Sequence, residues 1–124
     1  MNKWNYVLKN NKKFASIKEL KEGDEIISLD RYNNFVKSEI TSVKNLGQKE
    51  ILYIRTNKSY IQCDKDQNIF TVNKMVKASE LNIGDEIITS EGFDYVKGIY
   101  NKGIEDCYKI TASNGYLVNG ILAF

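Results

Sequence analysis

The two cysteines, Cys63 and Cys107, carry thiols that could act as nucleophiles. A thiol attacks as its thiolate, which forms near neutral pH when a base or a positive charge lies beside it. The sequence contains no histidine, which excludes Ser-His-Asp triads, histidine general bases and histidine-ligated metal sites. A cytosolic cysteine without such a base usually serves as a small buried hydrophobic residue, and we expect this of both thiols.

Metal and cofactor sites are not indicated by any other cluster of side chains. The two cysteines lack the close paired spacing of zinc ligands. The segment Asp64-Lys65-Asp66 begins like a Ca²⁺ loop, but the glycine and distal glutamate of an EF-hand are absent, so we expect a solvated turn. The sequence therefore predicts no metal and no cofactor.

Length and composition describe one ordinary globular domain. The 124 residues are 42% hydrophobic and 27% charged, which suffices for a core and argues against disorder. Charges of both signs are interspersed and leave a net charge of +2, which does not favour a nucleic-acid partner. No apolar run is long enough to span a membrane, and the polar start does not resemble a signal peptide. With only two cysteines, we expect a cytoplasmic protein.

Short β-type segments alternate with turn signals at intervals of about eight to twelve residues, which is typical of an all-β barrel or sandwich. Because proline is absent, the turns must use Gly, Asn and Asp, and Asn119-Gly120 has the composition of a type I′ hairpin turn. Residues 16–21 and 77–81 read as single helical turns. The predicted strands cover residues 26–29, 35–43, 50–56, 59–63, 68–72, 86–89, 95–100, 107–111 and 116–118.

The chain also repeats a short motif. Residues 20–27 (LKEGDEII) recur as residues 81–88 (LNIGDEII), and six of the eight positions are identical. Similar lead-ins, SIKEL and KASEL, and further echoes in the same order predict two related halves, about 14–72 and 75–124, that complete one shared core. In each copy the glycine permits a turn, and Asp24 and Asp85 are expected to cap that turn rather than to form a catalytic pair.

These motifs resemble the Hint (hedgehog/intein) domain, in particular inteins and bacterial intein-like protein-splicing domains. The resemblance rests on the two L-x-x-G-D-x-I segments and on the ending YLVNGILA at residues 116–123. It covers nearly the whole chain and leaves no room for an inserted homing endonuclease, as in a mini-intein. It implies an all-β, horseshoe-shaped fold of two pseudo-twofold halves in a single domain.

The resemblance also implies chemistry on the chain's own backbone. In this family a Cys, Ser or Thr at the N-terminal junction attacks the preceding carbonyl, and a Thr-x-x-His element assists. A terminal Asn, preceded by His, then cyclises. The implied partners are the flanking host-protein segments of the same chain, and a monomer is expected.

The sequence departs from the family pattern at each chemical position. Asp64 and Gln67 stand for the Thr and His of Thr-x-x-His, and Phe124 stands where the penultimate His is expected, with no terminal Asn after it. The expected first nucleophile would lie immediately ahead of Met1. The six family-equivalent positions are Asp64, Gln67, Lys109, Asn114, Asn119 and Phe124, where Lys109 replaces an Asp and Asn114 a His.

We therefore predict an intein-type Hint domain that no longer splices. Gln67 can donate a hydrogen bond but cannot protonate a leaving group. Two other classes remain open at this point: a noncatalytic β-scaffold or protein-interaction module with the same fold, and an unrelated small β-barrel binder whose repeated motif is coincidental. The tyrosines at strand spacing are expected to pack across strands rather than to stack on bases.

Overall fold

The computed structural model describes residues 1–124, and strands account for most of them. The all-β prediction is confirmed, because the only helices are two single 3₁₀ turns, at Ile17–Glu19 and Ala78–Glu80. No helix in the structure has the length and apolar character needed to cross a membrane. The strands are β1 (Tyr6–Leu8), β2 (Phe14–Ser16), β3 (Glu25–Leu29), β4 (Phe35–Thr56), β5 (Tyr60–Cys63), β6 (Asn68–Phe70), β7 (Met75–Lys77), β8 (Glu86–Thr89), β9 (Gly92–Ala112), β10 (Tyr116–Val118) and β11 (Ile121–Ala123).

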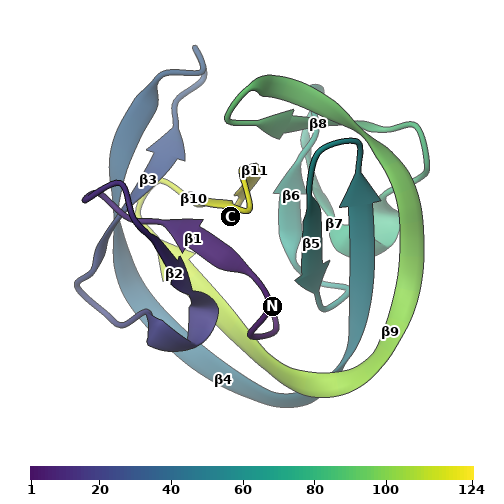
Figure 1. The fold of residues 1–124 in the computed structure, drawn as a ribbon, viewed down its shortest axis with the longest axis horizontal. Helices are drawn as coiled ribbons and strands as arrows, with labels where there is room; N and C mark the ends of the chain where they lie inside the picture. Colours follow the sequence, from purple (N-terminus) through teal and green to yellow (C-terminus); the bar gives the residue numbers. More distant parts are fainter.

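Strands β4 and β9 are the longest elements and pair antiparallel along most of their length. They curve together along the lower edge of Figure 1 and up both sides. The sequence predicts a break near the middle of each, and this is wrong. Asn45 and Asn101 each accept a hydrogen bond from the glycine two residues on, Gly47 and Gly103, at 2.8 and 2.9 Å. Both glycines have positive φ, so the turn signal makes a β-bulge within a continuous strand.

The two Gly-Asp segments form the same turn. Gly23 and Gly84 have φ angles of +92° and +95°, and each donates its N–H to a strand carbonyl at 2.8 Å. The Asp24 and Asp85 carboxylates each accept a bond from the backbone N–H three residues upstream, at 3.1 and 2.8 Å. The assignment of both aspartates as turn caps is confirmed. Matched bonds of this kind are what an internal duplication predicts.

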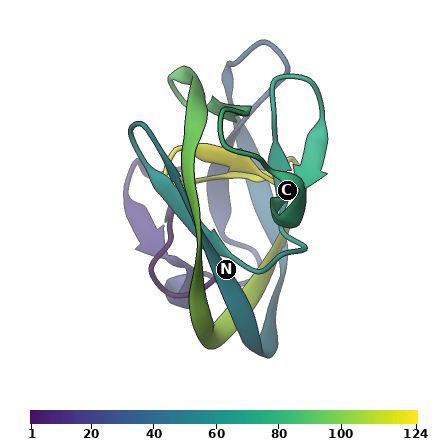
Figure 2. The same cartoon turned by 90° about the vertical axis from the view of Figure 1, so that its right-hand side faces the viewer.

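Short strands fill the space inside the curve of β4 and β9. Strand β10 pairs with β1 on one side and β11 on the other, and β11 in turn meets β6 and β8. The predicted type I′ turn at Asn119-Gly120 joins β10 to β11, with φ angles of +50° and +82°. Both chain ends lie inside the curve, as the two perpendicular views show (Figures 1 and 2).

The core has a main cluster of 21 buried residues, in which isoleucine is the commonest type, and a small second cluster of Leu29, Leu117 and Leu122. Cys63 and Tyr116 belong to the main cluster and are fully buried, as the cysteine prediction expects of Cys63. Tyr53 stacks on Tyr60 with ring centroids 5.6 Å apart and lies 6.2 Å from Tyr100, so these tyrosines do pack across strands.

The folded state should lose stability between about pH 9 and 12 because of Cys63. Burial raises the pKa of this thiol from 9.0 to about 12, so the unfolded chain releases the proton first as the pH rises. The contribution is complete below the unfolded pKa and then falls by up to about 1.4 kcal/mol per pH unit. Urea unfolding of the wild type and Cys63→Ala at pH 8 and pH 11 measures it. The cost of the substitution should shrink at pH 11, and an equal cost at both pH values would contradict a buried neutral thiol.

The turn-capping carboxylates give a second prediction. Asp24→Ala and Asp85→Ala should each lower the free energy of unfolding by about 1–2 kcal/mol, because a backbone N–H loses its charged acceptor. Asp24→Asn keeps an acceptor oxygen and should lose less. Exposed Glu22 lies in the same turn, and Glu22→Ala should stay within about 0.5 kcal/mol of the wild type. Urea titration of the four variants tests the role, and a loss in Glu22→Ala as large as in Asp24→Ala would refute it.

Candidate functional site

A network of buried amides fixes the first residues of the chain. Asn2 and Asn5 are fully buried, and Gln62 of β5 is 6% exposed. The Asn2 side-chain amide donates to Gln62 Oε1 at 2.8 Å, and the Asn5 amide donates to the Gln62 carbonyl at 2.8 Å. The Gln62 N–H returns a bond to Asn5 Oδ1 at 2.9 Å. Buried amides are stable only when they are paired in this way, so the segment has one well-defined position against β5.

The network carries Met1 into the middle of the fold. Met1 is fully buried, and its amino group donates to the Tyr108 carbonyl at 2.6 Å. The same nitrogen lies 3.2 Å from Cys107 Sγ and 3.9 Å from Asp64 Oδ1. The sequence reasoning places the junction nucleophile ahead of Met1. In the structure Met1 itself occupies the buried central position, because the hydrogen bonds of Asn2 and Asn5 to Gln62 hold it there.

Cys107 and Asp64 make a thiol–carboxylate pair beside this nitrogen. Cys107 Sγ donates to Asp64 Oδ1 over 3.5 Å, and the Asp64 side chain keeps 14% exposure. Burial raises the pKa of the Cys107 thiol, while the neighbouring ammonium group opposes that shift. Both thiols are buried, as expected, and Cys107 has in addition a carboxylate and the Met1 nitrogen as neighbours, which the sequence did not indicate.

Gln67 lies with Asp64 in the turn between β5 and β6, and it contacts the C-terminal end of the chain. Its side-chain amide donates to the Tyr116 hydroxyl at 3.0 Å and approaches the Phe124 carbonyl oxygen at 3.5 Å. Burial raises the pKa of the Tyr116 hydroxyl, so this group stays neutral. A hollow of about 230 Å³ lies alongside and brings together four of the predicted positions, Asp64, Gln67, Lys109 and Phe124.

The other two predicted positions, Asn114 and Asn119, lie elsewhere. Asn114 is exposed, and its side-chain amide donates to the Lys37 carbonyl at 3.0 Å. The Asn119 amide donates to the Tyr60 carbonyl at 2.8 Å, and its side-chain oxygen accepts from the Tyr6 N–H at 3.0 Å. The Asn119 amide also approaches Asn5 Oδ1 at 3.5 Å and so reaches the edge of the buried amide network. Neither asparagine contacts Met1, Asp64 or Cys107 through a hydrogen bond.

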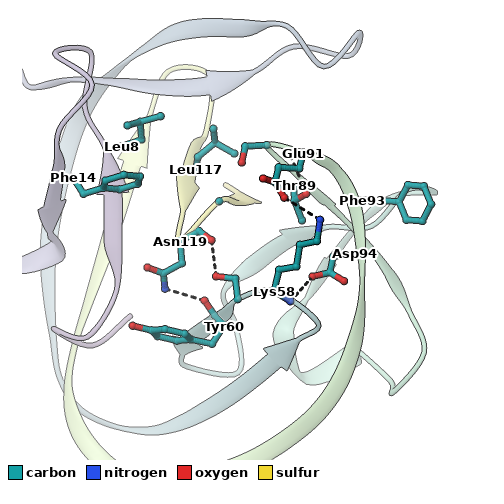
Figure 3. Close-up of a pocket in the computed structure, with 13 residues that line it drawn as sticks. Leu8, Phe14, Lys58, Tyr60, Thr89, Glu91, Phe93, Asp94, Leu117 and Asn119 are labelled. Atoms are coloured by element: carbon teal, nitrogen blue, oxygen red, sulfur yellow. Dashed lines mark hydrogen bonds and ion pairs between the residues drawn. The ribbon is translucent and has the colours of Figure 1, made fainter.

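Asn119 lines a larger cavity of about 410 Å³, shown in Figure 3. Ser59 Oγ donates to the Asn119 carbonyl at 2.6 Å, and the Asp94 carboxylate accepts from the Lys58 N–H at 3.0 Å. Lys58 and Glu91, which both line this cavity, form an exposed ion pair at 3.2 Å. The hydroxyl of Ser59 is committed to a backbone oxygen, so Ser59 is not arranged as a nucleophile.

Sequence reasoning did not identify the residues that place Met1. Asn2, Asn5 and Gln62 read as ordinary polar positions, because no motif marks a buried amide cluster in one sequence. The one usable signal for Tyr116 was its place at the start of the intein-like ending. Cys107 was singled out as a thiol, but its carboxylate partner lies 43 residues away in the chain.

Neither a protein-family model nor a protein of curated function matches the sequence. Solved structures do match. A DnaB intein from Synechocystis sp. PCC 6803 superposes with a TM-score of 0.89 and 17% identity, covering 99% of this chain and 95% of that chain. A bacterial intein-like domain from Clostridium thermocellum gives 0.85 and 18%, covering 97% and 94%. The gp41-1 intein gives 0.86 and 19%, covering 98% and 94%.

The likeness extends over nearly all of this chain and of each of these structures. An unrelated small β-barrel, one of the alternatives left open by the sequence, is therefore wrong. The chain has the Hint (hedgehog/intein) fold, the all-β fold of inteins and bacterial intein-like domains.

Proposed function

We propose that this chain is an intein-type Hint domain that acts on its own backbone and has lost splicing. The proposal rests on one observation: both ends of the chain lie beside the turn that contains Asp64 and Gln67. The Met1 nitrogen lies 3.9 Å from the Asp64 carboxylate, and the Phe124 carbonyl oxygen lies 3.5 Å from the Gln67 amide. A domain that holds both of its ends at one site is built to position two junctions. Its partners would be flanking host-protein segments of the same chain, and it would work as a monomer.

Loss of splicing follows from the chemistry of the residues at this site. Met1 carries a thioether, which cannot open a peptide bond as a Cys or Ser can. Gln67 donates a hydrogen bond at every pH but cannot deliver a proton to a leaving nitrogen. Phe124 offers neither an acid nor a side-chain amide that could cyclise. The site keeps the positioning of an intein and lacks the histidines that donate protons in that family.

Compartment is part of the proposal. Cys63 and Cys107 are both free and buried, which fits a reducing environment, so we place the domain in the cytoplasm. The contacts of the site use backbone groups and uncharged amides in the main, and neither a metal nor a cofactor enters the proposed role.

A second candidate is a noncatalytic β-scaffold or protein-interaction module. One observation favours it: no buried side-chain nitrogen or oxygen lacks a hydrogen-bond partner. A fully paired interior is typical of a structural core and leaves no polar group waiting for a substrate.

Fusing the 124-residue chain between two unrelated folded proteins tests the loss of splicing. Without added thiol, intact-mass spectrometry over a day should show one unchanged mass. Met1 cannot open a peptide bond as Cys or Ser can, and Gln67 cannot deliver a proton to the leaving nitrogen. No ligated product of the flanking proteins should form. Ligated flanking proteins from the unaltered chain would overturn the proposed loss of splicing.

A restored variant separates the two candidates. Met1→Cys, Gln67→His and Phe124→His, with Asn added after residue 124, return the family's groups to the site. If the fold retains intein positioning, this variant should release or ligate the flanking proteins. Met1→Cys alone is the matched control and should be much slower. A folded restored variant that stays intact would favour the scaffold candidate.

A further inference from the structure

Aromatic side chains gather on the outer face of the sheet where β5, β4 and β9 lie side by side (Figure 1). Tyr53 of β4 lies directly opposite Tyr100 of β9. Arg55 of β4 lies opposite Tyr60 of β5 and opposite Gly98 of β9. Because alternate residues of a strand share a face, and directly opposite residues do so too, these five positions lie on one face of the sheet. Tyr100 is 53% exposed, so this face is directed to solvent.

The aromatic rings on this face lie in a continuous row. The Tyr53 ring stacks on Tyr60, with centroids 5.6 Å apart, and its centroid lies 6.2 Å from that of Tyr100. The Tyr60 hydroxyl donates to the Trp4 carbonyl at 2.7 Å, which brings Trp4, 46% exposed, beside the tyrosines. Of the three tyrosine hydroxyls, only that of Tyr60 has a hydrogen-bond partner within the chain. We call Trp4, Tyr53, Tyr60 and Tyr100 the aromatic strip.

The Tyr100 ring lies across Gly98. A Cβ atom added at Gly98 would lie 2.6 Å from both Cε2 and the hydroxyl oxygen of Tyr100, which is too close for any side chain. The glycine therefore leaves the space that the ring occupies, and the rest of the ring faces solvent. Tyrosine and tryptophan rings held in this way are typical anchors of protein interfaces.

Two positive charges beside the aromatic strip have no ionic partner within the chain. Lys3 and Arg55 take part in none of the ion pairs, whereas Lys102 pairs with Glu105 at 3.4 Å. The ammonium groups of Lys3 and Lys102 lie 5.1 and 5.7 Å from the centre of the Trp4 ring, within the range of a cation–π contact. The strip thus combines apolar rings, free hydroxyl donors and unpaired positive charge. Such a surface complements a partner that carries hydrogen-bond acceptors and negative charge.

A proline-rich peptide in the polyproline II conformation has these properties. It makes no internal hydrogen bonds, so its carbonyl oxygens are free to accept from tyrosine hydroxyls, and proline brings no N–H that would need an acceptor. Its rise of about 3.1 Å per residue places alternate residues about 6.2 Å apart, which matches the ring spacings of 5.6 and 6.2 Å along the strip. Proline-rich segments dock on aromatic-lined surfaces for these reasons.

We propose that the aromatic strip binds an acidic, proline-rich peptide segment of a partner protein. The rings contact the prolines, the hydroxyls of Tyr53 and Tyr100 donate to peptide carbonyls, and carboxylates of the peptide pair with Arg55 and Lys3. The inference goes beyond the proposed function, because no residue of the strip contacts the Asp64 and Gln67 side chains. The fusion experiments above therefore keep their meaning whichever way this binding is decided.

Fluorescence of Trp4 measures the binding, because it is the only tryptophan of the chain. The complete chain is titrated at low ionic strength with a capped synthetic peptide of eight prolines followed by two glutamates. The fluorescence should change saturably. Two lysines in place of the glutamates should weaken binding by about tenfold, because they meet the unpaired positive charges. A peptide whose prolines are replaced by glycine and serine should not bind, since it lacks both the rings and the fixed conformation.

Variants locate the binding on the strip. Tyr100→Ala should weaken it by about tenfold or more, and so should Gly98→Ala, which keeps the tyrosine but removes the space for its ring. Arg55→Glu should shift the preference toward the peptide that ends in lysines. Tyr32 is 69% exposed and lies in the turn before β4, outside the strip, so Tyr32→Ala is the matched control and should bind as the wild type does. Circular dichroism verifies that each variant is folded.

Three results would overturn the proposal. The first is the absence of a saturable fluorescence change with the acidic proline peptide. The second is equal binding of this peptide to folded Tyr100→Ala and Tyr32→Ala. The third comes from a ten-residue oligothymidylate titrated in parallel: if it binds and the peptide does not, the strip is a base-stacking surface and the peptide assignment fails.

Discussion

The antiparallel pairing of β4 and β9 is the constraint on which the rest of the structure depends. Two paired strands of 22 and 21 residues would follow one continuous twist if they stayed regular. The bulges at Gly47 and Gly103 bend them without breaking the ladder, because a glycine with positive φ takes up the extra residue. The curve encloses a space for short strands that could not form a stable sheet alone. Both ends of the chain reach the centre only because this space exists.

Burying the polar groups of the first residues inside the core costs free energy. The amides of Asn2, Asn5 and Gln62 and the amino group of Met1 all lose water, and each unpaired group would cost about 1–3 kcal/mol. Hydrogen bonds oppose that cost, since each of these groups has protein partners and no buried side-chain polar atom is left without one. The network is therefore specific as well as stable. It permits one position of Met1 and so fixes which atoms of Cys107 and Asp64 the nitrogen meets.

Features set by a few neighbouring residues could be predicted from the sequence, and features set by distant pairing could not. The Gly-Asp turns and the Asn119-Gly120 hairpin depend on local backbone preferences, and both were predicted correctly. The same local reasoning failed at Asn45-Gly47, because a turn signal and a bulge signal use the same residue types and only the partner strand decides between them. The resemblance brought together Asp64, Gln67, Lys109 and Phe124. It could not reveal that Cys107 faces Met1, since that contact joins residues 106 positions apart.

The site has two halves with different chemistry, one around the uncharged Gln67 amide and one around the Met1 nitrogen. On the C-terminal side, the uncharged amide of Gln67 donates to the Tyr116 hydroxyl and faces the Phe124 carbonyl. An amide does not titrate, so the contacts of Gln67 depend little on pH. On the N-terminal side, the Cys107 thiol, the Asp64 carboxylate and the Met1 nitrogen lie within hydrogen-bond or ion-pair distance of one another. Proton transfer is possible only where such groups meet. The groups of this site that can exchange a proton therefore lie around Met1, while Gln67 holds the C-terminal end through hydrogen bonds.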